Sequence, residues 1–157
     1  MKKTLVAFYS RTGTTRKVAN EIAKSLKCDV DEIIDEKKRE GILGYLRSGK
    51  DATFKNPAKI KTSKDPSKYD LVVIGTPIWA YNMCSAVRTY ITNNKDKFKK
   101  VAFFCTQGGS GGSTAFKSIR ELCNKAPVLT IEFNAEDVIN GDYIISAKAF
   151  AKYLKED

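Results

Sequence analysis

The sequence predicts an α/β protein with three layers, in which a doubly wound parallel sheet of five strands lies between two layers of helices. Short runs of apolar residues alternate with stretches in which apolar residues recur every third or fourth position, the pattern of strands alternating with amphipathic helices. The runs are apolar without interruption, which is typical of strands buried on both faces of a parallel sheet. With 157 residues, the chain has the length of a single domain, residues 1–157.

The first part of the chain predicts a strand, a helix and a second strand. Residues 5–9 are apolar throughout and predict a buried strand, which the polar residues 10–13 end. A helix follows, with Thr14 or Thr15 as its expected N-cap. Its apolar face consists of residues spaced by about one helical turn, Val18, Ile22 and Leu26. Residues 30–34 are more polar, as expected for an outer strand.

Residues 35–69 form a long excursion within the domain. The segment is charged, contains two prolines and has too few apolar residues for a core of its own. One short amphipathic helix is predicted in it, from Ile42, Leu43, Tyr45 and Leu46. Loops of this length are usually functional or disordered.

Strand and helix alternate again in the rest of the chain. Two further buried strands are predicted at residues 71–75 and 101–105, and a fifth strand, with Thr130 and Glu132 on one side, at residues 127–133. Helices are predicted where apolar residues return to helical spacing, at residues 83–91, 116–123 and 143–154. Parallel sheets of this kind bind ligands in the crevice outside the carboxyl ends of their strands. Three loops are therefore candidates for a site: residues 10–15, 76–84 and 106–112.

Composition excludes several classes of function. The chain has 28 Lys+Arg and 18 Asp+Glu, a net charge of +10, and no histidine. Without histidine there is no Ser-His-Asp or Cys-His triad and no histidine metal site. The basic residues are scattered and no nucleic-acid-binding motif accompanies them, so we expect a solvated basic face and no nucleic-acid partner. The four cysteines are too dispersed for a metal site and are expected to be reduced and buried.

Neither a signal peptide nor a membrane span is predicted. The apolar run that follows Met1-Lys2-Lys3 ends at Tyr9, which is too short for the apolar part of a signal peptide. No stretch approaches the ~20 apolar residues that a membrane helix needs. We therefore expect a cytoplasmic protein without a membrane partner.

The first candidate loop has the chemistry of an anion site. It reads Ser10-Arg11-Thr12-Gly13-Thr14-Thr15, with four hydroxyls and one glycine between a buried strand and the start of a helix. The free N–H groups and the dipole of a helix N-terminus favour a phosphate there. Neither a GxxxxGKS/T nor a GxGxxG pattern is present, which argues against a nucleoside triphosphate or a dinucleotide. The alternative is an N-cap with spare hydroxyls.

Together, the three loops resemble those of the flavodoxin family. Residues 10–15 follow its hydroxyl-x-Thr-Gly-x-Thr phosphate pattern, residues 75–83 (GTPIWAYNM) are similar to its second flavin loop, and residues 106–112 (TQGGSGG) to its third. The resemblance extends over nearly the whole chain and implies a flavodoxin-like sheet with strand order 2-1-3-4-5 and FMN as the cofactor. The implied FMN-binding residues are Ser10, Arg11, Thr12, Gly13, Thr14, Thr15, Thr76, Pro77, Ile78, Trp79, Tyr81, Asn82, Thr106, Gln107, Gly108, Gly109 and Gly112.

The flat ring of a flavin suggests roles for the second and third loops. Trp79, the only tryptophan, and Tyr81 are expected to stack on the ring or to wall its pocket, and the alternative is that both cap the core. Pro77 rigidifies the turn, and Asn82 is a candidate hydrogen-bond partner for the ring edge. The glycines of the third loop let main-chain N–H groups approach a ligand closely. Gln107 is a candidate to reach the pyrimidine edge.

Two departures from the family bear on function. The third loop has no tyrosine to cover the outer flavin face, and the chain is basic where typical flavodoxins are acidic. The preferred interpretation is a low-potential electron carrier, a monomer or weak dimer, that docks to acidic redox partner proteins. Its potential is expected to be less negative than that of acidic flavodoxins.

Other functions stay open. The alternative is an NAD(P)H-dependent, FMN-containing reductase of quinones or similar small acceptors, which an open third loop and a basic surface favour. A third interpretation is a flavodoxin-like fold that binds no flavin. Residues 41–47 either fold over the site and place Tyr45 or Arg47 beside the flavin, or form an independent surface helix.

Overall fold

A five-stranded parallel sheet forms the centre of the protein. The computed structural model describes residues 2–37, 41–53 and 57–157. The strands lie in the order β2 (Asp29–Glu32), β1 (Thr4–Phe8), β5 (Leu71–Trp79), β7 (Lys100–Gln107) and β8 (Thr130–Asn134), and all neighbours are parallel. Numbered along the chain, this is the predicted order 2-1-3-4-5. The doubly wound α/β prediction is therefore confirmed.

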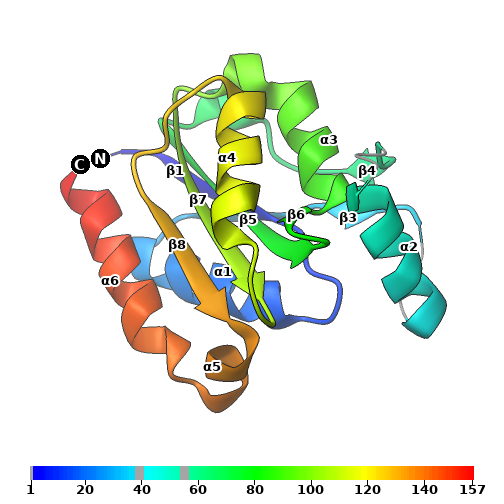
Figure 1. The fold of residues 1–157 in the computed structure, drawn as a ribbon. Coiled ribbons are helices and arrows are strands. Elements are labelled where there is room, and N and C mark those ends of the chain that lie inside the picture. Colours follow the sequence, from blue (N-terminus) through cyan, green and yellow to red (C-terminus); the bar gives the residue numbers. More distant parts are fainter. Residues whose placement is uncertain (1, 38–40, 54–56) are drawn as a thin grey trace.

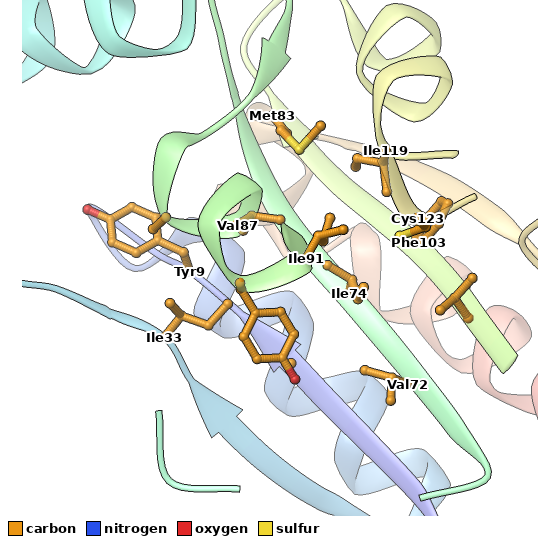
Figure 2. Packing of buried hydrophobic residues seen from close by; sticks show 14 of the residues in the cluster. Tyr9, Ile33, Val72, Ile74, Met83, Val87, Ile91, Phe103, Ile119 and Cys123 are labelled. Atoms are coloured by element: carbon orange, nitrogen blue, oxygen red, sulfur yellow. The ribbon is translucent and has the colours of Figure 1, made fainter. Parts of the chain in front are cut away.

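Helices cover both faces of the sheet (Figure 1). One face packs against α3 (Ser85–Asn94) and α4 (Gly112–Cys123), and the other against α1 (Thr14–Leu26) and α6 (Tyr143–Glu156). The central strands alternate their side chains between the two layers, so that Leu5 and Ala7 enter one core and Val6 and Phe8 the other. Figure 2 shows the first of these cores, where Ile74 and Phe103 of the sheet pack with Val87, Ile91 and Ile119 of the helices.

Several boundaries differ from the prediction. The outer strand ends at Glu32 instead of residue 34, and the last strand begins at Thr130 instead of residue 127. The strand expected to end at residue 75 continues to Trp79 and turns back as the short β6 (Asn82–Met83). The continuation reflects pairing, because β7 bonds alongside β5 as far as Pro77 and β6 bonds with its last residues. A short helix that was not predicted, α5 (Ala135–Asn140), follows β8.

The start of α1 also corrects the prediction. Thr14 and Thr15 lie inside the helix, and Gly13 is the N-cap, with a φ of 101° that favours glycine. No side chain caps this end. Thr15 is buried and its hydroxyl bonds with that of Thr106, so it does not cap the helix.

The excursion folds onto the same core. It contains β3 (Ile34–Asp35) and β4 (Ile60–Lys61), which pair antiparallel, the 13-residue helix α2 (Gly41–Thr53), longer than predicted, and the 3-10 turn η1 (Pro66–Lys68). Outside the excursion, a second 3-10 turn, η2 (Lys95–Lys97), directly follows α3. The buried carboxylate of Asp31 holds the returning chain by accepting hydrogen bonds from the N–H and hydroxyl of Ser63 and from Lys64 N–H. In Figure 1, α2 lies at the side of the molecule next to β3 and β4.

No helix in the described part of the chain combines the length and the apolar character needed to cross a membrane.

Candidate functional site

Three loops meet at the carboxyl ends of the neighbouring strands β1, β5 and β7. Inside, the hydroxyl oxygens of Thr15 on α1 and Thr106 on β7 lie 2.8 Å apart. On the outside, the third loop touches the second, since a Cβ at Gly111 would lie only 2.9 Å from the Tyr81 Cα. The sheet order thus brings together loops that are far apart in the sequence.

The first loop presents an open helix N-terminus. The Gly13 N–H donates to the Ser10 hydroxyl at 3.1 Å, which closes a tight turn before α1. Because no side chain caps α1, the N–H groups of its first turn lack the usual side-chain acceptor. The helix dipole adds partial positive charge at the same place. This end of α1 can therefore hold an anion.

The four hydroxyls of this loop do not act alike. Ser10 and Thr15 are buried and bonded inside the protein, whereas Thr12 is exposed and Thr14 is half-buried. Two hydroxyls that bond to each other share one hydrogen, so the Thr15–Thr106 pair keeps a second O–H not used between them. The sequence alone does not distinguish these four hydroxyls as donors.

A cleft of ≈ 280 Å³ opens beside the first loop. Tyr9, Ser10 and Arg11 line it on one side and residues 32–37 on the other. At its edge, Arg16 forms a two-pronged ion pair with Glu32, with Nη2 to Oε1 at 2.6 Å and Nε to Oε2 at 3.0 Å. This pair offsets much of the Arg16 charge beside the first loop.

The second loop is a two-residue hairpin turn between β5 and β6. Ala80 and Tyr81 form the turn with φ of 47° and 61°, a conformation that suits glycine and asparagine. Trp79, before the turn, is 8% exposed and meets the ring of Tyr9 edge-on, with ring centres 5.5 Å apart. Tyr81 is 64% exposed. Of the two predicted stacking residues, Trp79 therefore belongs to the wall and core, and Tyr81 offers the accessible ring.

The polar residues of the second loop mostly brace it. The buried Thr76 hydroxyl donates to the Pro77 carbonyl and accepts from Cys84 N–H. The Asn82 Oδ1 accepts from Met83 N–H and from Arg88 Nη2. These bonds turn the Thr76 and Asn82 oxygens toward the protein.

Arg88 on α3 adds a positive charge that the sequence prediction missed. Burial lowers the pKa of its guanidinium, and its buried Nε has no hydrogen-bond partner among the described residues. It lies beside the hairpin through its bond to Asn82. An arginine one helical turn after the loop, on the face of Cys84, is the sequence signal that could have indicated it.

In the third loop, the glycines have different roles. Gly108, Gly109 and Ser110 are exposed, and a Cβ at either glycine would meet no atom within 4 Å. Gly111 has a φ of 111° and is the N-cap of α4. Gly112 is buried, and a side chain there would overlap the carboxylate of Glu132. Gly112 thus makes room for Glu132, a residue outside the predicted site.

Burial keeps the thiols of Cys105 on β7 and Cys123 at the end of α4 protonated. Burial, with a smaller effect from the charge of Glu132, raises the pKa of Cys105 to about 12. Burial likewise raises the pKa of Cys123 to about 12. Cys84 at the start of α3 is fully buried. Protonated, inaccessible thiols are poor nucleophiles.

Comparison with known families decides the identity of the chain. A model of the family described as Flavodoxin matches residues 3–154. The chain belongs to the flavodoxin family. No curated protein matches it significantly.

Solved flavodoxin and flavoprotein structures share this fold. A flavoprotein from Lactobacillus acidophilus in complex with FMN is 22% identical with a TM-score of 0.74, covering 90% of this flavodoxin and 98% of its own chain. Oxidised flavodoxin 1 from Bacillus cereus is 16% identical with a TM-score of 0.60, covering 99% and 98%. A WrbA-like flavodoxin from Agrobacterium tumefaciens is 13% identical with a TM-score of 0.57, covering 97% and 98%.

The excursion of this flavodoxin reaches the neighbourhood of the site through α2, which contacts β5 and β6. Leu43, Leu46 and Arg47 on α2 are exposed. The Tyr45 side chain, predicted as a possible cover for the flavin, lies outside the described residues. The two interpretations of residues 41–47 therefore both stay predictions.

Proposed function

We propose that this flavodoxin binds FMN and carries electrons between redox proteins. The observation that carries the proposal is the N-terminus of α1, which no side chain caps and which Gly13 leads into in a left-handed conformation. Such an end holds a phosphate through its N–H groups and dipole. The flavoprotein relative from Lactobacillus acidophilus, which is described in complex with FMN, supports the choice of a flavin monophosphate.

The residues present fit FMN. The exposed Thr12 and half-buried Thr14 hydroxyls add neutral donors for the phosphate at the end of α1. Tyr81 supplies an accessible aromatic ring, and Trp79 and Tyr9 a buried aromatic wall. When bound, FMN supplies the one- and two-electron redox chemistry, and the protein supplies binding and electrostatics. Arg88 adds positive charge near the second loop, and this charge would attract negative charge on a ligand bound there.

Several properties support a carrier. The chain has no histidine for acid–base chemistry and is a small α/β unit. Its net charge of +10 favours acidic protein partners through long-range attraction. We infer a monomer or weak dimer acting in the cytoplasm, without nucleic-acid or membrane partners.

A second candidate function is an NAD(P)H-dependent reductase of quinones or similar acceptors. Gly108, Gly109 and Ser110 are exposed, and no aromatic residue is among them. A flavin beside such a loop has room for a second flat reactant. The test below separates this candidate from the carrier.

Reconstitution with FMN tests the proposal. We expect the protein to take up one FMN, and anaerobic NADPH to leave the bound flavin oxidised while photoreduction bleaches it. Rapid bleaching by NADPH would establish the reductase, and a protein that stays colourless would refute FMN binding altogether.

A variant of the first loop tests whether FMN binds at the N-terminus of α1. Thr12→Val removes one protein hydroxyl that is proposed to donate to the charged phosphate. It is expected to weaken FMN binding by about 1.5–3 kcal/mol, or roughly 10- to 100-fold. Thr62→Val, at an exposed position in the excursion, is the matched control and should bind FMN as the wild type does. Equal affinities for both variants would remove the first loop from the site.

A further inference from the structure

Glu132 lies where β8 faces the third loop, and its carboxylate makes two contacts. It accepts a hydrogen bond from the Nε2 of Gln107, the last residue of β7. It also lies against Gly112, at the first turn of α4, close enough that a Cβ there would overlap it. The first turn of α4 has no acidic residue and no side-chain cap of its own. Glu132 therefore supplies the negative charge that this helix end favours.

The bond to Glu132 fixes which way the Gln107 amide points. An ionised carboxylate only accepts hydrogen bonds, so it must face the NH₂ group of the amide. The amide oxygen then points away from Glu132. This Oε1 atom is buried and has no hydrogen-bond partner among the described residues. A buried acceptor without a donor is unfavourable, and a ligand that brings an N–H group would satisfy it.

We propose that Glu132 is a positioning residue that holds the Gln107 Oε1 as the acceptor for an N–H group of the bound ligand. This inference rests on the proposed function and deepens it. The pyrimidine edge of FMN carries one N–H, at N3, between two carbonyl groups. With its NH₂ group held by Glu132, Gln107 selects the N3–H and not the flanking carbonyls. The site thus prefers flavins in which N3 carries a hydrogen over flavins in which it does not.

Access to the Gln107 oxygen depends on the third loop. Gly108 and Gly109 directly follow Gln107, and nothing lies within 4 Å of where their side chains would start. Both are exposed. The space beside these two residues is therefore open, which leaves room for a ligand next to Gln107.

Binding of FMN and of its N3-methylated derivative tests the inference. Methylation removes the N–H that Gln107 is proposed to recognise, so the wild type should bind FMN about 10-fold or more tightly than 3-methyl-FMN. Gln107→Met keeps the length of the side chain without its hydrogen-bonding groups. It should weaken FMN and bring the ratio of the two affinities to within about 2-fold.

A second pair of variants tests the role of Glu132. Glu132→Gln lets the Gln107 amide turn over, because the new amide can donate as well as accept. The ratio between the two flavins should fall at least about 3-fold, a change that loss of stability alone would not produce. Glu136→Gln, an exposed change on α5, is the matched control and should keep the wild-type ratio.

The outcomes separate the inference from the proposed function. If FMN binds but Gln107→Met keeps the wild-type ratio, or Glu132→Gln does not reduce it, the positioning role is wrong and FMN binding stands. If neither flavin binds to the wild-type protein, both proposals fail. Titration by quenching of flavin fluorescence measures all of these affinities.

Discussion

The side-chain oxygens of Thr15 and Thr106 lie 2.8 Å apart in the buried interior, although 91 residues separate them in the sequence. This hydrogen bond joins the first turn of α1 to the end of β7. It therefore links the loop that is proposed to hold a phosphate to the loop that carries Gln107. Among the described residues, neither threonine has a second hydroxyl partner that could take the place of this bond.

Removing one hydroxyl of this pair should destabilise the protein more than removing both. Thr106→Val leaves the buried Thr15 hydroxyl unpaired and should cost about 1–3 kcal/mol of unfolding free energy in urea. The double variant Thr15→Val/Thr106→Val replaces both partners by apolar groups of the same shape and should recover most of that loss. Thr130→Val, at an exposed strand position, is the control and should change stability by less than about 0.5 kcal/mol. Additive losses in the double variant would contradict the bond.

Two glycines should respond to alanine with opposite signs. At Gly75 on β5, a Cβ would overlap the ring of Phe104, its direct neighbour on β7. Gly75→Ala should therefore lower the unfolding free energy by about 1–3 kcal/mol or more. At Gly49 in α2, a Cβ would meet nothing within 4 Å, so Gly49→Ala should raise it by about 0.4–1 kcal/mol. Urea unfolding at one pH measures both, and a harmless Gly75→Ala would show that Phe104 moves aside freely.

The strained hairpin turn should separate stability from cofactor affinity. Asparagine tolerates the left-handed conformation of Ala80, so Ala80→Asn should stabilise the fold by about 0.5–1 kcal/mol and leave FMN affinity unchanged. Tyr81→Gly relieves the same kind of strain but removes the accessible ring. It should weaken FMN by about 0.5–1.5 kcal/mol. Thermal unfolding and flavin titration give the two readouts, and an unchanged FMN affinity in Tyr81→Gly would remove Tyr81 from the site.

Asp70 should contribute to stability in a pH-dependent way. Its carboxylate accepts from Lys3 N–H at 2.9 Å and from Lys99 Nζ at 3.0 Å, and these bonds, the first above all, hold its pKa below the ordinary 3.8. The folded state thus binds this proton less readily than the unfolded chain. The contribution is fully present above pH ~3.8 and is lost as the pH falls through the lower folded-state pKa.

Asp70→Asn should therefore be less stable than the wild type at neutral pH, with the difference shrinking below pH ~3.8. Urea unfolding from pH 7 down to acid measures it. Asp142→Asn provides the control, since Asp142 is exposed and its side chain does not cap α6. A difference that stays constant with pH would show that the Asp70 charge is not involved.

Much of the fold is predictable from short-range patterns. The uninterrupted apolar runs around Val6, Val73 and Phe103 identify the three central strands, because both faces of each strand are covered. The helical spacing of Val18 and Ile22 likewise identifies α1. The edges are harder, since Asp29 and Thr130 begin strands that are only partly buried and lack a continuous apolar signal. The hairpin after Trp79 is not predictable from the sequence, because Ala80 and Tyr81 are not typical turn residues.

The candidate site divides in the same way. The sequence by itself determined the order of the five parallel strands and the main helices, the three loops and the hydroxyl-rich motif, because these depend on residue type and spacing along the chain. Only the tertiary structure decided that Gly13 and not a threonine caps α1, that Trp79 faces the core while Tyr81 faces outward, and that Gly112 makes room for Glu132. Each of these depends on contacts between strands and helices distant in sequence, where packing and hydrogen bonding outweigh local preference.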